Sequence, residues 1–146
     1  MLLHSNGMTT DGVLHTVADL HNLAPIRDFV EHRAAALGAP PSIAADLVLA
    51  TDEAVTNVIE HGYRGQRGAL EIEVRREAQD VVIFVRDHAP PFDLTSVPAP
   101  DLNIPLDERE PGGLGIFLIR QYTDQVSHRV MSQGGNELVL RKSIVA

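Results

Sequence analysis

The segment DEAVTNVIEH, residues 52–61, holds two polar side chains within a stretch that otherwise predicts a buried helix. Glu53 and Asn57 are four positions apart, and this spacing puts both side chains on one helix face. A carboxamide oxygen is a hard, neutral ligand for Mg²⁺, and a neighbouring carboxylate can accept a proton from a nucleophilic hydroxyl or water. The pair therefore indicates either a magnesium–phosphate site or a solvent-exposed helix face, which is the commoner reason for such a pattern.

Two other segments could contribute to such a site. Asp87 ends the apolar run VVIFVRD shortly before two prolines. It either starts a turn or points into a pocket, where it would accept a hydrogen bond from an amino group such as that of adenine. In the segment PGGLGIFLI, residues 111–119, three glycines stand at the start of a predicted helix. Exposed backbone N–H groups at a helix start bind phosphate, although a hinge before a helix has the same composition.

The rest of the composition excludes several classes of site. The seven histidines are scattered without metal-ligand spacing, cysteine is absent, and no phosphate loop of the Walker type is present in the sequence. The net charge of −8 argues against binding to nucleic acid. Because neither a signal peptide nor a membrane-spanning run is recognisable, we expect a cytoplasmic protein that binds no membrane.

The period of the apolar residues predicts the elements that must position these side chains. We expect a strand over 12–20, helices over 20–37 and 43–61, a hairpin of strands 69–77 and 80–87, a helix over 112–122, and a final hairpin over 125–131 and 136–142. Asp19 and Ser42 are the expected helix caps, and Gly38 and Gly62 the expected helix ends. Residues 88–111 hold six of the nine prolines and no periodic pattern, which predicts a long loop.

This order of elements predicts an α+β fold. It is a two-layer α/β sandwich in which helices cover one face of a mixed, mostly antiparallel sheet. The length of 146 residues and the hydrophobic content of 44% suit one domain with its own core. We expect residues 1–10 to be a flexible tail and residues 11–146 to form that domain.

The three polar segments occur in one order: a helical E-x-x-x-N, an aspartate at a strand end, and glycines that open a helix. Together they resemble the ATP-binding domain of the GHKL superfamily of ATPases and kinases. One branch of this superfamily has similar sequence motifs: the anti-sigma factor serine kinases of the RsbW/SpoIIAB type in bacterial partner-switching systems. The motifs that resemble this branch are ATDEAVTNVIEHGY, VRDHAPPFD and GGLGIFLIRQ. The likeness runs from about residue 12 to residue 142.

This resemblance implies ATP and Mg²⁺ as cofactors and a role for residues of each segment. Asn57 would be a ligand of Mg²⁺ and Glu53 the catalytic base, while Asp87 would accept the adenine amino group. Residues 94–111 would form a lid over ATP, and Arg109 within it would reach the terminal phosphate. The other ATP-binding residues would line the adenine pocket or lie against the phosphates: Ala89, Phe92, Gly113, Leu114 and Gly115.

The same resemblance implies a function and its partners. A protein of this type sequesters a sigma factor, phosphorylates a serine of a STAS-domain anti-anti-sigma protein, and acts as a homodimer. Three alternatives stay open: an ATP-binding anti-sigma module without kinase activity, a kinase that controls another partner-switching output, and a histidine-kinase catalytic domain. The last needs a phosphoacceptor histidine followed by an acidic residue, and neither His21 nor His32 is followed by one.

One position departs from the family pattern. The usual D-x-G after the strand is Asp87-His88-Ala89 here. If the backbone needs a positive φ at this position, alanine would cost about 1–2 kcal/mol. If it does not, the methyl group only adds bulk near the adenine. Pro111 also stands where some members have a further glycine, and both departures would affect ATP affinity more than the fold.

Overall fold

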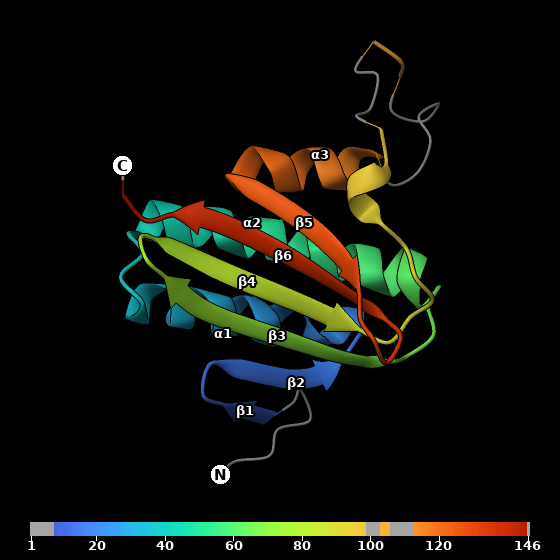
Figure 1. The fold of residues 1–146 in the computed structure, drawn as a ribbon, viewed down its shortest axis with the longest axis horizontal. Helices are drawn as coiled ribbons and strands as arrows, with labels where there is room; N and C mark the ends of the chain where they lie inside the picture. Colours follow the sequence, from blue (N-terminus) through green and yellow to red (C-terminus); the bar gives the residue numbers. More distant parts are fainter. Residues whose placement is uncertain (1–7, 99–102, 106–112, 146) are drawn as a thin grey trace.

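One antiparallel sheet forms the first layer of the protein (Figure 1). The computed structural model describes residues 8–98, 103–105 and 113–145. Within them the strand order across the sheet is β1-β2-β3-β4-β6-β5, so β6 lies between β4 and β5. Every neighbouring pair is antiparallel. The strands are β1 (Met8–Thr10), β2 (Val13–Val17), β3 (Ala69–Glu77), β4 (Asp80–Asp87), β5 (Gln125–Val130) and β6 (Asn136–Ser143).

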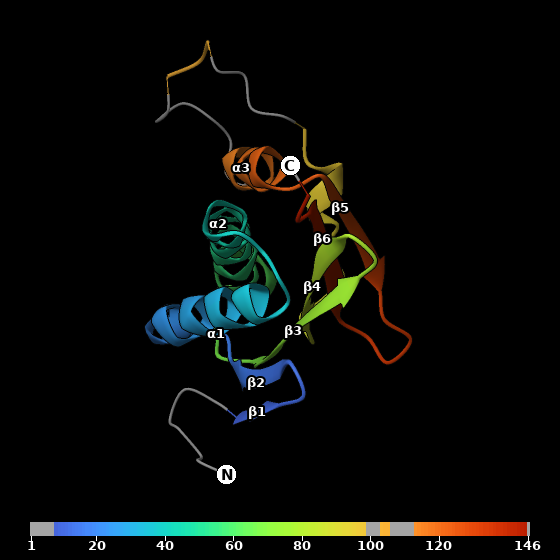
Figure 2. The ribbon, with the colours of Figure 1, turned by 90° about the vertical axis from the view of Figure 1, so that its left-hand side faces the viewer.

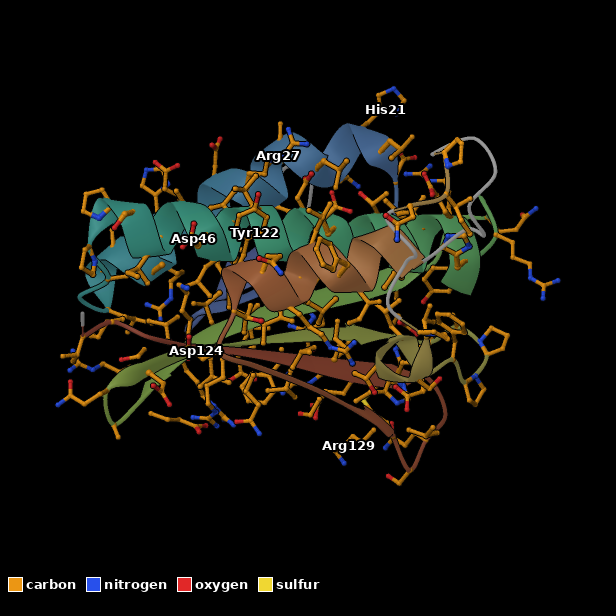
Figure 3. All side chains as sticks on the ribbon, turned by 90° about the horizontal axis from the view of Figure 1, so that it is seen from above. His21, Arg27, Asp46, Tyr122, Asp124 and Arg129 are labelled. Carbon is orange, nitrogen blue, oxygen red and sulfur yellow. The ribbon has the colours of Figure 1, made fainter. Side chains whose placement is uncertain are left out.

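Three helices form the second layer and cover one face of the sheet (Figure 2): α1 (Leu23–Ala36), α2 (Pro41–Asn57) and α3 (Gly113–Tyr122). The central helix α2 contacts both α1 and α3, and α3 lies alongside it when the molecule is seen from above (Figure 3). This arrangement confirms the predicted two-layer α+β sandwich, although the described sheet is antiparallel throughout and not mixed as predicted. No helix in the described part of the chain is long and apolar enough to cross a bilayer.

Apolar and charged residues alternate along β3, and this alternation explains why the sheet has one buried face. Leu70, Ile72 and Val74 are buried, whereas Glu71 and Glu73 between them are only half-buried. Successive side chains of a strand point to opposite faces, so the apolar set faces the helices. It joins apolar side chains of the other central strands and of all three helices in one core. Each large side chain buried there stabilises the fold by roughly 1.5–3 kcal/mol.

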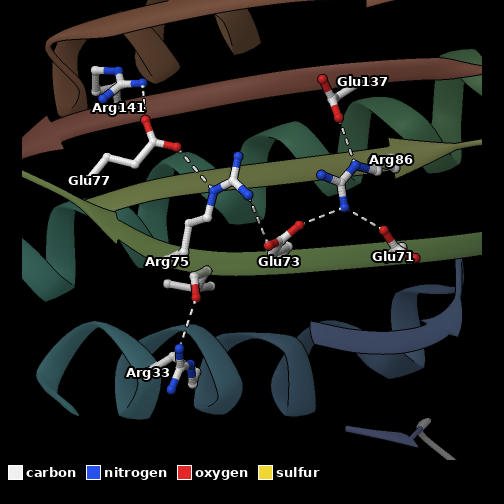
Figure 4. A network of polar contacts seen from close by, with 9 residues as sticks. Arg33, Glu71, Glu73, Arg75, Glu77, Arg86, Glu137 and Arg141 are labelled. Carbon is white, nitrogen blue, oxygen red and sulfur yellow. Dashed lines mark hydrogen bonds and ion pairs between the residues drawn. The ribbon is translucent and has the colours of Figure 1, made fainter. Parts of the chain in front are cut away.

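The other face of the sheet carries a network of charged side chains (Figure 4). Arg86 of β4 forms ion pairs with Glu71 and Glu73 of β3. On its other side, its Nε lies 2.7 Å from Glu137 Oε2 of β6. The guanidinium also lies over the Phe84 ring, 4.8 Å from its centroid. These contacts join the three central strands on the face that no helix covers.

The predicted ends of α1 are confirmed. Asp19 caps a short 3-10 turn, Leu20–Asn22, that leads directly into the helix, and its side chain accepts a hydrogen bond from His21 N at 2.9 Å. At the other end Gly38 has a φ of 102°, a left-handed conformation that commonly ends helices. The helix therefore stops where the sequence predicts.

Two other element ends differ from the predictions. Met8–Thr10 belongs to the sheet as β1, although we expected a flexible tail there. It pairs with β2 across a turn at Asp11 and Gly12, whose φ values are 45° and 79°. The second helix begins at Pro41 and has no side-chain cap, so the prediction of a Ser42 cap is wrong. Proline suits the first helical position because its fixed φ matches the helix and it lacks an N–H that would stay unpaired.

Candidate functional site

The end of α2 presents Glu53 and Asn57 one turn apart, as the sequence predicts. Asn57 is 9% exposed, and its Nδ2 donates a hydrogen bond to the backbone oxygen of Glu53 at 2.7 Å. Because the helix backbone holds Nδ2, the amide has one fixed orientation. No described residue donates to Asn57 Oδ1, so this oxygen can accept a cation or a donor from a bound molecule.

Glu53 is partly buried on the same helix. Burial raises the pKa of its carboxyl group, and the charges of Asp52 and Glu60 raise it further. A carboxylate with a raised pKa binds a proton more strongly than an ordinary glutamate does. Its place one turn before Asn57 therefore suits a group that receives a proton from a nucleophile.

Directly after Asn57 the helix widens into a π turn, Val58–Gly62, in which Tyr63 N donates to the Val58 oxygen at 2.8 Å. Such turns occur frequently at functional sites. Here the turn brings Gly62 against Ala89, because a Cβ added at Gly62 would lie 3.2 Å from the Ala89 Cβ. The turn thus shapes the wall where α2 meets the segment after β4.

Asp87 lies at the end of β4 and is 4% exposed. Its Oδ1 accepts hydrogen bonds from Ala89 N at 2.9 Å and from Asn136 Nδ2 at 3.0 Å. Within the described residues both hydrogen bonds of this carboxylate end on Oδ1, which leaves Oδ2 as an acceptor for an amino group. Asp87 and Asn57 line one cleft between α2 and the sheet.

The cleft is narrow, with a volume of about 30 Å³. Ligand sites usually have roughly 300–1,000 Å³, so a base that enters must widen it. Apolar side chains form much of the lining, and Asn57, Asp87, His128 and Asn136 provide its polar atoms. Phe92 also lines the cleft and is 41% exposed, so this ring is the wall residue least held by packing.

The glycine segment reaches the same cleft from a distant part of the chain. Gly115, in the first turn of α3, lies directly against Asn57, because a Cβ at this position would come 2.5 Å from Asn57 Nδ2. Only a residue without a side chain allows this approach. Gly113 is the first residue of the same helix. The side chain of Leu114, the whole of Arg109 and the remainder of segment 94–111 apart from 94–98 and 103–105 lie outside the described residues.

Ala89 replaces the family glycine without backbone strain. The described non-glycine residues with positive φ are Asp11, Arg64 and Ala78, so Ala89 does not adopt the left-handed conformation. Its side chain is 2% exposed and lies against Gly62. The energetic cost considered from the sequence therefore does not arise, and the methyl group fits because residue 62 is glycine.

Sequence reasoning missed two polar residues of the cleft, His128 of β5 and Asn136 of β6. His128 Nε2 lies 2.8 Å from Asn136 Oδ1. The available signal was the glycine pair that precedes Asn136. A Cβ at Gly135 would lie 2.0 Å from the backbone oxygen of Asp87, so glycine is needed where β6 starts beside the end of β4.

The comparison with known families identifies the domain. The model of the histidine kinase-like ATPase domain matches residues 16–142. The chain belongs to this family. The match covers the α2 end, the Asp87 strand end and the glycines of α3, and it confirms the resemblance found in those three segments.

Named relatives of this ATPase domain are kinases and anti-sigma factors. The chain is 30% identical over 95 residues to the serine/threonine-protein kinase BtrW of Bordetella bronchiseptica. The aligned residues make up 64% of this chain and 66% of that protein. The chain is 26% identical over 97 residues to the anti-sigma F factor of Clostridium kluyveri, which covers 66% and 68%. It is 27% identical over 103 residues to the serine-protein kinase RsbW of Bacillus cereus, which covers 68% and 63%. The chain thus spans about two thirds of the length of these relatives.

A solved structure supports the fold of the domain. The crystal structure of the RsbU and RsbW domains of Rv1364c from Mycobacterium tuberculosis superposes with a TM-score of 0.61 at 20% identity. The superposition covers 90% of this chain and 32% of that chain. At this identity the likeness shows the fold alone, and the shared fold is the two-layer sandwich described above.

The residues of this ATPase domain fit Mg²⁺ only together with phosphates. In the described part of the chain no group of three or more histidine, cysteine, aspartate or glutamate side chains could hold a metal ion. Mg²⁺ needs few protein ligands when water and phosphate fill its coordination sphere. Asn57 Oδ1 is one neutral oxygen of fixed direction, and Asn57 packs against Gly115 in the first turn of α3.

Proposed function

We propose that this chain is an ATP-dependent serine kinase and anti-sigma factor of a bacterial partner-switching system. It binds Mg-ATP, phosphorylates a serine of a STAS-domain anti-anti-sigma protein, and sequesters a sigma factor. The family of the domain and the names of its relatives support the proposal. The observation that carries it is the packing of Gly115 against Asn57, one turn from Glu53. This packing brings the start of α3, where phosphates would bind, next to the proposed metal ligand and the proposed base.

In this proposal ATP lies in the cleft between α2 and the sheet. The Oδ2 atom of Asp87 accepts the adenine amino group, and Ala89 and Phe92 contact the base. At the other end of the site, N–H groups in the first turn of α3 donate to the phosphates, since a helix start favours anions. The residues concerned are Gly113, Leu114 and Gly115. Arg109 is assigned to the terminal phosphate by the family resemblance alone.

Asn57 Oδ1 is the proposed protein ligand of Mg²⁺, which when bound neutralises charge on the phosphates. Glu53 accepts the proton of the serine hydroxyl while the serine oxygen forms a bond to the γ-phosphorus. The bond from that phosphorus to the bridging oxygen breaks, and ADP leaves. The raised pKa of Glu53 suits this role. Phosphoryl transfer depends mainly on positioning and charge neutralisation, which this small set of groups can supply.

The net charge of the chain is compatible with protein partners. The net charge of −8 suits a partner with a basic surface and disfavours direct contact with nucleic acid. Homodimerisation, a cytoplasmic location and the STAS-domain partner belong to the proposal through the family resemblance. The sigma factor is supported by the relative named as an anti-sigma factor.

The test is phosphoryl transfer from γ-labelled Mg-ATP to the STAS-domain proteins of the same genome. We expect label on a serine of one of them, dependent on Mg²⁺, and none after that serine is changed to alanine. Binding of each sigma factor is measured on the same preparation by gel filtration. Binding of ATP and a sigma factor without transfer to any STAS protein would contradict a kinase and leave an ATP-binding anti-sigma module.

A further inference from the structure

Asn136 uses the full hydrogen-bonding capacity of its side chain in the wall of the cleft. It is 6% exposed. Its Nδ2 donates to Asp87 Oδ1 at 3.0 Å and to the backbone oxygen of Pro90 at 3.1 Å. Its Oδ1 accepts hydrogen bonds from Phe92 N and from His128 Nε2, both at 2.8 Å. A buried amide with two acceptors and two donors around it is held in a single orientation.

His128 connects this amide to the segment that follows β4. Its side chain is 7% exposed, and its Nδ1 lies 3.6 Å from Asp93 Oδ1. Asp93 caps the 3-10 turn Leu94–Ser96 by accepting a hydrogen bond from Thr95 N at 2.9 Å. From α3, Arg120 Nη2 donates to the Thr95 oxygen at 2.9 Å. The start of the segment is therefore fastened to β5, β6 and α3 together.

We propose that Asn136, supported by His128, is the positioning residue that sets specificity for the base. Through one amide it orients the carboxylate of Asp87 and holds the backbone of Phe92, the exposed ring of the cleft wall. The same side chain thus positions both the carboxylate of Asp87, which would accept a hydrogen bond from the base, and the ring of Phe92 beside it. The inference rests on the proposed binding of ATP and adds a specificity-determining residue to it.

The physical argument concerns rotation of the Asp87 carboxylate. Two donors, Ala89 N and Asn136 Nδ2, end on its Oδ1, so Oδ2 keeps one position. Without the Asn136 donor, only a donor of the adjacent backbone remains, and the carboxylate can turn away from a bound amino group. A hydrogen bond to a charged group changes affinity by roughly tenfold or more. The preference for a purine that carries an amino group should fall accordingly.

The experiment compares ATP with purine riboside triphosphate, which lacks the 6-amino group, in calorimetric titrations with Mg²⁺. Asn136→Leu, close to asparagine in size, removes the donor to Asp87 and the acceptor of Phe92 N without placing a second carboxylate beside Asp87. His128→Phe removes the second support, while His128→Gln keeps a side chain that can donate to Asn136. The matched control is Asn22→Leu, because Asn22 is 5% exposed and donates to a backbone oxygen at 2.8 Å outside the cleft.

We expect the wild-type protein to bind ATP about tenfold tighter than the analogue, and Asn136→Leu to abolish most of this preference. His128→Phe should reduce it, whereas His128→Gln and the control should keep it. Hydrogen exchange of peptides over residues 90–97 should slow with Mg-ATP in the wild type and the control, and much less in His128→Phe. If Asn136→Leu does not fold, the two His128 variants test the inference.

Two results would overturn the inference. One is an unchanged preference in folded variants, and the other is an equal loss of affinity for both nucleotides, which indicates a structural role only. Binding of ATP without phosphoryl transfer would remove the kinase activity and leave the inference intact. A wild-type protein that binds neither nucleotide would contradict the proposed function itself, and the inference with it.

Discussion

Gly115 lies so close to Asn57 that a methyl group at position 115 would come 2.5 Å from Asn57 Nδ2. A carbon and a nitrogen atom cannot share this space, so one partner would have to move. Asn57 is held by its bond to the backbone oxygen of Glu53, and Gly115 belongs to a helix whose Ile116 and Ile119 are fully buried. The contact is therefore firm, and it sets the direction of the amide relative to the first turn of α3.

We expect Gly115→Ala to weaken Mg-ATP binding by about tenfold or more, because the displaced amide loses its direction. The free energy of unfolding should fall by about 0–2 kcal/mol, because overpacking outweighs the gain in helix propensity. Overpacking costs roughly 1–3 kcal/mol, while alanine stabilises a helix interior by about 1 kcal/mol relative to glycine. Calorimetry and urea unfolding measure the two quantities. In an Asn57→Ala background the same substitution should cause no further loss of affinity, and additive losses would contradict an effect through Asn57.

Glu53→Gln should keep ATP affinity and slow transfer to the partner serine by roughly 10²–10⁴. Glutamine preserves shape but cannot accept the proton. Single-turnover transfer and nucleotide affinity are measured on one preparation. Transfer at the wild-type rate would exclude Glu53 as the base, and parallel loss of affinity and transfer would make it a structural residue.

Glu53→Gln should also change how the free energy of unfolding depends on pH. The pKa of Glu53 is raised in the folded protein by burial and by Asp52 and Glu60. Its contribution to stability is then present below the unfolded pKa and lost as pH rises through the folded pKa. At neutral pH the charged carboxylate therefore opposes folding. Glu53→Gln should raise the free energy of unfolding at pH 7 and change it little in acid, and a gain independent of pH would contradict this account.

Ala89→Gly should keep the fold and leave ATP affinity equal or higher. The methyl group is buried against Gly62, and the backbone of Ala89 needs no positive φ. Glycine should cost about 0.5–1 kcal/mol through the entropy of the unfolded chain. Thermal unfolding and calorimetry measure both effects. A large loss of affinity would show that ATP binding depends on the methyl group and that the pocket is built around it.

The charged face of the sheet should stabilise the fold in a pH-dependent way. Burial opposes ionisation of Glu137, but hydrogen bonds from Arg129 and Arg86 hold its pKa below the usual value. Such a group contributes stability above its unfolded pKa and loses it as pH falls through the folded pKa. Glu137→Gln should cost about 1–3 kcal/mol at neutral pH and less in acid, by urea unfolding. Glu31→Gln, at an exposed position of α1, is the control, and equal losses at both pH values would contradict the argument.

Local spacing predicted the helix-borne part of the site. The pair Glu53 and Asn57 follows from helical periodicity, and Asp87 follows from its place at the end of an apolar strand. The partners of these residues depend on topology instead. Asn136 meets Asp87 only because β6 lies between β4 and β5, and His128 joins it from the outer strand. No pattern within either strand indicates that neighbour relationship. The glycine pair before Asn136 signals a close backbone approach but does not identify Asp87 as the partner.

The backbone conformation of Ala89 could not be predicted from the sequence either. Two conformations were compatible with Asp87-His88-Ala89, and they differ in whether alanine is strained. The answer depends on Gly62, a residue of the π turn after α2, which leaves room for the methyl group. The π turn itself follows a regular helical pattern in the sequence and carries no separate signal.

The central claim is that the cleft binds Mg-ATP through Asn57. Calorimetric titration of ATP into the wild-type protein and into Asn57→Ala, each with Mg²⁺ and with EDTA, tests it most directly. We predict tight binding to the wild type that weakens strongly when Mg²⁺ is removed, and weak binding to Asn57→Ala that hardly depends on Mg²⁺. Equal affinity of both proteins for ATP in the presence of Mg²⁺ would contradict the account.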